Sequence, residues 1–180
     1  MDSPTLLEAT ANAGLWTACI IAVIAGAWDL RHRVIPNTLT YGGLAAAAVI
    51  AIVQGTVAAS LTGFLVAGGC AFALYLVRAM AGGDVKLLAA LGALLGYPLS
   101  LDLLFFGVLF GGAWSIFVLA MKGMLLATLR DIWLLIRSLL YPQVPLFVPA
   151  EGVHVAGGAV IAAATVWIAL SVLLSTYAAL

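Results

Sequence analysis

Residues 9–28 read ATANAGLWTACIIAVIAGAW, a run of 20 residues without a charged side chain. An α-helix needs about 20 mainly apolar residues to cross a bilayer, so this run predicts a membrane-spanning helix. Ala25-Gly26-Ala27 near its end resembles the cleavage site of a secretory signal peptide. Asp2 and Glu8 precede the run, however, and no Lys or Arg does. We therefore expect the helix to be retained rather than cleaved.

Further spans follow from the intervals between charged residues along the rest of the chain. Residues 34–77 contain 44 uncharged residues, enough for two helices with a turn expected at Gln54-Gly55. The interval 87–101 contains only 15, so the next helix must be short, and we expect it to begin near Asp84. Six spans are predicted in all, near 9–28, 34–54, 57–77, 84–98, 103–121 and 152–178.

The composition of the whole chain agrees with this interpretation. Hydrophobic residues make up 66% of the 180 residues and charged residues only 8%, and the mean hydropathy is +1.24. We therefore predict an all-α polytopic membrane protein, a single membrane-embedded domain over residues 1–180 with the lipid bilayer as a partner. The 7 basic residues balance the 7 acidic ones, which argues against nucleic-acid binding. Cys19 and Cys70 stand apart in apolar stretches and indicate neither a disulfide framework nor a zinc site.

Residues 124–141 are apolar but contain charged residues, and a charge at the bilayer centre costs about 2.5–3.5 kcal/mol. Lys122, Arg130 and Arg137 recur at spacings of eight and seven residues. This spacing predicts one cationic helical face, with Leu, Ile and Trp133 on the other. We therefore expect an interfacial amphipathic helix near 124–141, lying in the plane of the membrane surface.

The positions of the cations predict the orientation of the chain. With six spans, all 7 Lys and Arg residues fall on one side of the membrane, and such residues concentrate in cytoplasmic loops. Both termini are thus expected to be extracytoplasmic, in a multi-pass protein of the inner (cytoplasmic) membrane.

Two carboxylates are predicted to lie at the same depth in the membrane. Asp29 follows the first span, which runs toward the cytoplasm, and Asp84 begins the fourth, which runs away from it. Each precedes cations closely, so each carboxylate could simply cap a helix or form an ion pair at the interface.

The sequences around these two residues carry a specific resemblance. Asp29-Leu30-Arg31-His32-Arg33-Val34-Ile35-Pro36-Asn37 and Gly82-Gly83-Asp84-Val85-Lys86 resemble the two signature segments of type IV prepilin peptidases, membrane aspartyl proteases with a Gly-x-Gly-Asp motif. Ala81 departs from this motif, since it stands where the first glycine is expected. Pro149-Ala150-Glu151-Gly152 is a weaker likeness to a Pro-x-Gly turn of the family. Because the chain lacks an insertion with paired cysteines, it is similar to the short branch that processes tight-adherence (Flp) pilins.

The resemblance implies an endopeptidase that removes the leader of a prepilin or pseudopilin at the cytoplasmic face, with Asp29 and Asp84 as catalytic residues. It implies no metal and no cofactor. Two carboxyl groups held close share a proton, so that one can accept a proton from water while the other donates a hydrogen bond to the scissile carbonyl.

Seven neighbouring residues are assigned supporting roles. The glycines before Asp84 would let an extended substrate backbone approach, and the proline and asparagine would start the second helix, with Asn37 or Thr38 as its N-cap. The lysine would either hold the charge of the carboxyl pair or reach for lipid phosphates. These residues are Gly82, Gly83, Lys86, Arg31, Arg33, Pro36 and Asn37.

Two other classes of function remain open from the sequence. A small proton-coupled transporter or channel component would use membrane carboxylates as proton relays, and a noncatalytic pilus-assembly scaffold would need no chemistry. The sequence does not indicate which pilin is cleaved or what the oligomeric state is.

Overall fold

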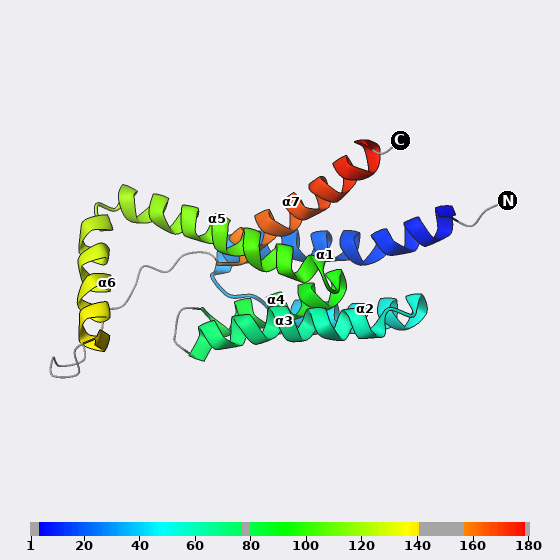
Figure 1. Cartoon of the computed structure of the whole chain (residues 1–180), viewed down its shortest axis with the longest axis horizontal. Helices are drawn as coiled ribbons and strands as arrows, with labels where there is room; N and C mark the ends of the chain where they lie inside the picture. The colour runs from blue at the N-terminus through cyan, green and yellow to red at the C-terminus, as the bar shows by residue number, and fades with distance from the viewer. Residues whose placement is uncertain (1–3, 77–79, 141–156, 179–180) are drawn as a thin grey trace. The chain divides into compact units, whose positions relative to one another are not determined.

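The computed structural model describes the backbone of residues 4–76, 80–140 and 157–178, and this part of the chain folds into helices alone (Figure 1). The predicted all-α fold is confirmed, and a helix lies near each expected position. The helices are α1 (Pro4–His32), α2 (Asn37–Gln54), α3 (Val57–Leu76), α4 (Gly82–Leu95), α5 (Leu99–Met121), α6 (Leu125–Leu140) and α7 (Gly157–Ala178).

The chain divides into two compact units. The first comprises Met1–Gly111 with Ala156–Leu180, and the second comprises Gly112–Val155. They are described separately below. The expectation that residues 1–180 act as a single membrane-embedded domain stays a prediction.

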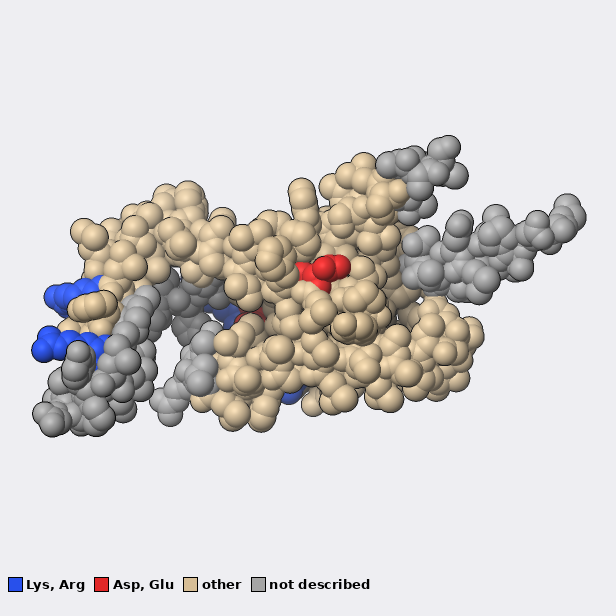
Figure 2. Space-filling model, in the orientation of Figure 1, with Lys and Arg blue, Asp and Glu red and all other residues tan. Residues whose placement is uncertain are grey.

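Five helices in the described ranges are long and apolar enough to cross a membrane, namely α1, α2, α3, α5 and α7. With 14 residues, α4 is shorter than a typical span. Most of the surface in Figure 2 is made of uncharged side chains, and many large apolar side chains are exposed on these helices. Such a surface suits contact with lipid tails, as in an integral membrane protein.

The short helix α4 forms the centre of the first unit. It contacts α1, α2, α3 and α7, and its residues from Leu87 to Leu94 are buried except for the half-buried Ala89. The neighbouring helices thus bury most of α4 beyond its first turn, although Gly82 and Lys86 near its start are exposed.

Glycines bring α3 and α4 into close contact. A Cβ atom added at Gly92 would lie 2.5 Å from both the Ala67 Cβ and the Gly63 carbonyl oxygen. Small residues permit this approach, which supplies van der Waals contact between helices in a membrane. Gly92 is therefore a packing residue of the contact between α3 and α4.

The turn between α2 and α3 lies where it was predicted. Gly55 follows α2 with φ 69°, a left-handed conformation, and its N–H donates to the carbonyl of Ile52 at 3.2 Å. Glycine adopts this conformation without steric cost.

The expected N-cap of α2 was wrong. Pro36 occupies the cap position without a side-chain hydrogen bond, and Asn37 is already helical. The Asn37 carboxamide instead bonds to Lys86 of α4. The Asn37 side chain, which the local sequence pattern assigned to capping, therefore makes a tertiary contact instead.

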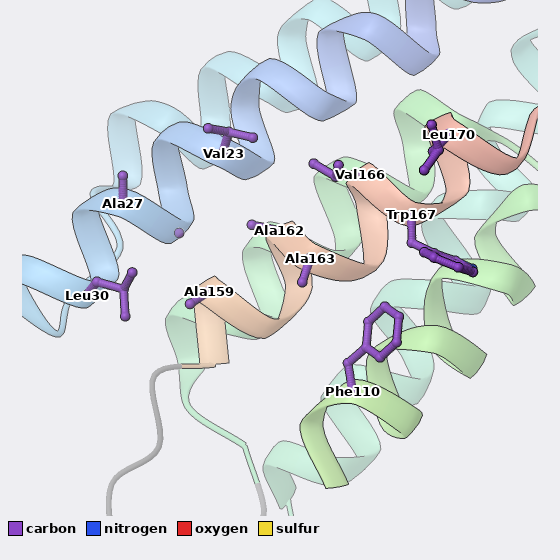
Figure 3. A pocket seen from close by; sticks show the side chains of 11 residues that line it. Val23, Ala27, Leu30, Phe110, Ala159, Ala162, Ala163, Val166, Trp167 and Leu170 are labelled. Carbon is purple, nitrogen blue, oxygen red and sulfur yellow. The ribbon is translucent and has the colours of Figure 1, made fainter. Parts of the chain in front are cut away.

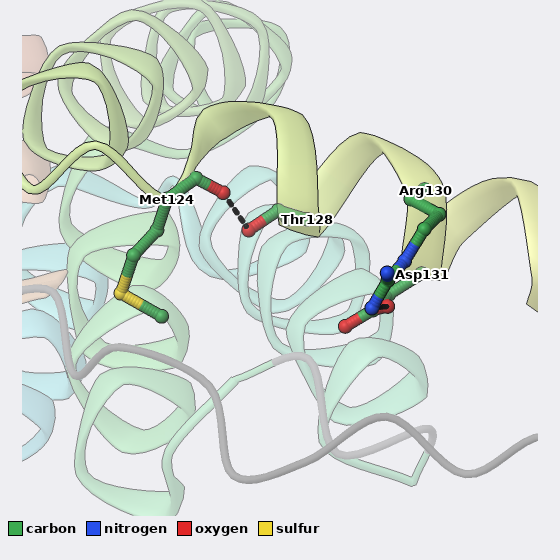
Figure 4. Close-up of polar contacts among 4 residues, drawn as sticks. All are labelled: Met124, Thr128, Arg130 and Asp131. Atoms are coloured by element: carbon green, nitrogen blue, oxygen red, sulfur yellow. Dashed lines mark hydrogen bonds and ion pairs between the residues drawn. The ribbon is translucent and has the colours of Figure 1, made fainter.

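The second unit contains α6, whose bounds agree with the predicted helix near 124–141. Within it, the Thr128 hydroxyl donates to the Met124 carbonyl at 3.0 Å, and Arg130 lies 3.7 Å from Asp131 (Figure 4). The placement of α6 in the membrane interface stays a prediction.

The expected distribution of residues around α6 needs correction. Lys122 lies in the turn after α5 and therefore belongs to no face of α6. Trp133 follows Arg130 by three residues and precedes Arg137 by four, which places it on the same side as both cations. Its side chain is 66% exposed. The pairing of Trp with Arg on one side is typical of residues at a membrane interface.

Candidate active site

Asp29 lies near the C-terminal end of α1 and faces α7. Its side chain is only 7% exposed, and its Oδ2 atom accepts a hydrogen bond of 2.9 Å from the backbone N–H of Gly158. The first N–H groups of a helix have no partner within the helix. Asp29 therefore satisfies one of the free donors at the start of α7.

Asp84 lies in the first turn of α4 and is half-buried. Its carboxyl group packs against Gly157, because a Cβ atom added there would lie 2.8 Å from the Asp84 Cγ. It also lies within the range of electrostatic interaction with the Asp29 carboxyl group. The structure thus brings the two predicted aspartates together, each beside one of the first two residues of α7.

Of the two alternative roles, helix capping is observed, because Asp29 accepts from the first turn of α7 and Asp84 bonds to the backbone of Ala81, the N-cap residue of α4. The other alternative, ion pairing at the interface, finds no support in the described ranges. There, neither Asp29 nor Asp84 pairs with a Lys or Arg, and the side chains of Arg31 and Arg33 are exposed. Arg33 directly follows α1 with φ 56°, and its N–H donates to the Asp29 carbonyl at 2.8 Å. The observed contribution of this arginine is therefore a backbone bond that closes the helix beside the candidate site.

Lys86 contacts α2 rather than the carboxylates. Its Nζ atom donates to Asn37 Oδ1 at 2.9 Å and lies 5.5 Å from the centre of the Tyr41 ring. A cation over an aromatic face is attracted by the ring electrons. These contacts connect the first turn of α4, which carries Asp84, to the first turn of α2.

The remaining supporting residues lie on the segments that carry the aspartates. A Cβ atom at Gly83 would lie 3.4 Å from the buried Ile35, and one at Gly82 would meet only Tyr75, at 3.7 Å. Pro36 precedes α2 in an extended conformation. Pro149-Ala150-Glu151-Gly152, the weaker likeness, lies outside the described residues.

Gly157 and Gly158 are site residues that the sequence interpretation missed. Both touch the carboxyl groups, although each stands more than 70 residues after Asp84 in the chain. The one available signal was a glycine pair at the beginning of the last apolar run. That signal is weak, because the chain has 19 glycines.

An apolar groove of about 580 Å³ runs between α1 and α7 with Phe110 of α5 at its side (Figure 3). Two of its lining residues, Leu30 and Ala159, are the chain neighbours of Asp29 and Gly158. The groove therefore reaches the chain neighbours of the Asp29–Gly158 contact, although neither Asp29 nor Gly158 lines it. In the described part of the chain, no three His, Cys, Asp or Glu side chains gather as a metal site would require.

Comparison with known proteins identifies the family. The family model for type IV leader peptidases matches residues 16–116, more than half of the 180-residue chain. No curated protein and no solved structure matches the chain. The matched segment contains both aspartates with the segments around them, and it ends within α5. The predicted family is thus confirmed, and this protein belongs to the type IV leader peptidase family.

Proposed function

We propose that this protein is a membrane aspartic endopeptidase that removes the leader peptide of a prepilin-like protein at the cytoplasmic face. The observation that carries the proposal is the meeting of Asp29 and Asp84, from separate helices, at the start of α7. Two carboxyl groups in a partly buried site are suited to acid and base chemistry because the interior strengthens their interaction.

The proposed chemistry needs only water and the two aspartates. One carboxylate removes a proton from water, whose oxygen attacks the scissile carbonyl carbon, while the other carboxyl group donates its proton to the carbonyl oxygen. In the second step the tetrahedral intermediate collapses. The C–N bond breaks, the leaving nitrogen receives a proton, and the hydroxyl proton returns to an aspartate.

The substrate class is proposed from the family and from the sequence together. Type IV leader peptidases imply a prepilin-like substrate. The two cysteines, Cys19 and Cys70, form no paired motif, which further supports the tight-adherence (Flp) branch, and pseudopilins remain in the same class. Peptide hydrolysis at the site requires no cofactor.

Co-expression tests the proposed function directly. The chain is produced with a tagged tight-adherence prepilin, and the substrate is followed by its electrophoretic mobility and by the mass of its new N-terminus. We expect a shortened substrate whose new N-terminus marks one internal cleavage site. A substrate that stays full-length with every candidate prepilin would contradict the proposal.

A reporter fusion tests the proposed topology. We expect a reporter fused after Leu180 to be extracytoplasmic and one inserted near Arg130 to be cytoplasmic, because cations concentrate in cytoplasmic loops. In the described ranges, α4 is buried among its neighbours despite its length, which supports counting it among the spans. A cytoplasmic C-terminus would mean that the segment near 124–141 spans the membrane after all, or that another helix was miscounted.

Substituting Lys86 tests whether it belongs with the catalytic pair. Because its amino group bonds to Asn37 and is exposed, Lys86→Gln should lower kcat/KM by a factor of about 3 to 10. Asn37→Ala should have a similar effect, and the double variant should be little worse than either single one. If a correctly inserted Lys86→Gln variant is completely inactive, the lysine acts in catalysis itself.

A further inference from the structure

The first turn of α7 contacts both members of the carboxyl pair. Gly157 packs against the Asp84 carboxyl group, while the next residue, Gly158, packs against Asp29 and donates its N–H to it. Both glycines lie outside the segment that matches the family model, which ends at residue 116, whereas both aspartates lie inside it.

A side chain at either position would displace a carboxyl group. A Cβ atom at Gly157 would overlap Asp84 Oδ2 and lie 2.9 Å from Oδ1. One at Gly158 would lie 2.9 Å from the Asp29 Cβ and 3.1 Å from its Oδ2. Asp29 is buried and Asp84 is half-buried. Neighbouring atoms therefore limit how far either carboxyl group can move away from an added side chain.

The approach of α1 to α7 explains why Asp29 has little freedom to move. A Cβ atom at Gly26, one turn before Asp29, would lie 2.8 Å from the Ala162 Cβ and 3.2 Å from the Gly158 carbonyl oxygen. The two helices are thus in backbone contact beside the carboxylate. A methyl group at Gly158 would have to push against a packed helix rather than a mobile side chain.

We propose that Gly157 and Gly158 are positioning residues for the carboxyl pair, fixing where Asp84 and Asp29 lie relative to each other. The proposal rests on the proposed function, because positioning has meaning only if the two carboxyl groups act together. Substituting either glycine would move a reacting group directly, because the added Cβ atom would contact the side chain of Asp84 or Asp29. The loss should therefore appear in kcat rather than in KM.

Alanine substitution at four glycines tests the effect on catalysis. A misplacement of about 1 Å can cost about 100-fold in rate, so Gly157→Ala and Gly158→Ala should each lower kcat by about that factor. The matched controls are Gly42→Ala and Gly69→Ala, helical positions where an added Cβ would meet nothing within 4 Å. Both should change kcat by less than about two-fold. Full activity of the Gly157→Ala and Gly158→Ala variants would overturn the proposal.

A double-mutant cycle on thermal unfolding reports the contact without any substrate. Gly157→Ala should lower the unfolding temperature of the detergent-solubilised protein, but not when Asp84→Ala has already removed the carboxyl group. Gly26→Ala is the structural control, because it crowds α7 without touching Asp84, so its cost should persist in both backgrounds. An equal cost of Gly157→Ala with and without the Asp84 carboxyl group would overturn the proposed contact.

The two experiments separate the inference from the function on which it rests. If the wild-type chain cleaves no prepilin, the proposed function fails, while the unfolding cycle still measures whether Gly157 and Asp84 interact. If the wild-type chain cleaves and the aspartate variants are inactive, but the Gly157→Ala and Gly158→Ala variants have normal kcat, the carboxyl pair stands and the positioning role fails.

Discussion

Asp29→Asn and Asp84→Asn are each expected to lower prepilin cleavage by about 100- to 10,000-fold, the usual contribution of general acid–base catalysis. Asparagine has nearly the shape of aspartate but can neither accept a proton from water nor donate one to the carbonyl. Its side-chain oxygen could still accept the hydrogen bond that the Gly158 N–H gives to Asp29. The loss would therefore reflect chemistry rather than unfolding.

Asp102→Asn provides the matched control for these two variants. Asp102 also lies in the first turn of a helix, α5, but it is exposed. We expect this variant to cleave at nearly the wild-type rate. All three proteins should insert and unfold at similar temperatures, which thermal unfolding in detergent would measure. Near wild-type cleavage by either the Asp29→Asn or the Asp84→Asn variant would assign that residue a structural role and exclude the two-carboxylate mechanism.

The positions of the helices were predictable because the bilayer imposes a strong constraint on the chain. Charged residues end spans, and so Arg33, Arg78 and Lys122 marked helix boundaries to within a few residues. The common depth predicted for Asp29 and Asp84 follows from the same reasoning. Helices that cross in opposite directions bring the end of one and the start of another to a common depth.

Contacts between helices that are distant in sequence were not predictable by this reasoning. Asn37 has the composition of an N-cap, yet its partner is Lys86, 49 residues later. Gly157 and Gly158 became site residues only when the close approach of α1 and α7 placed them beside the aspartates. A depth argument fixes position along the membrane normal, but it does not fix which faces of the helices meet.

The contact between α3 and α4 yields a second large effect, this time on stability. Gly92→Ala is expected to lower the free energy of unfolding by about 3 kcal/mol, at the upper end of the usual cost of overpacking. The added methyl group would lie 2.5 Å from the backbone oxygen of Gly63 as well as from the Ala67 Cβ. A backbone oxygen can move only if the whole helix moves, so the strain cannot be relieved by rotating a side chain.

Two further variants distinguish crowding from a general effect of substituting helical glycines. Gly69→Ala, in α3, meets open space and should be neutral or slightly stabilising, because alanine favours helix more than glycine does. Ala67→Gly combined with Gly92→Ala should recover only part of the loss, since the contact with the Gly63 oxygen remains. Equal stability of the Gly92→Ala and Gly69→Ala variants would mean that the two helices can separate without cost. Because α4 also carries Asp84 at its first turn, the crowded variant should lose prepilin cleavage together with stability.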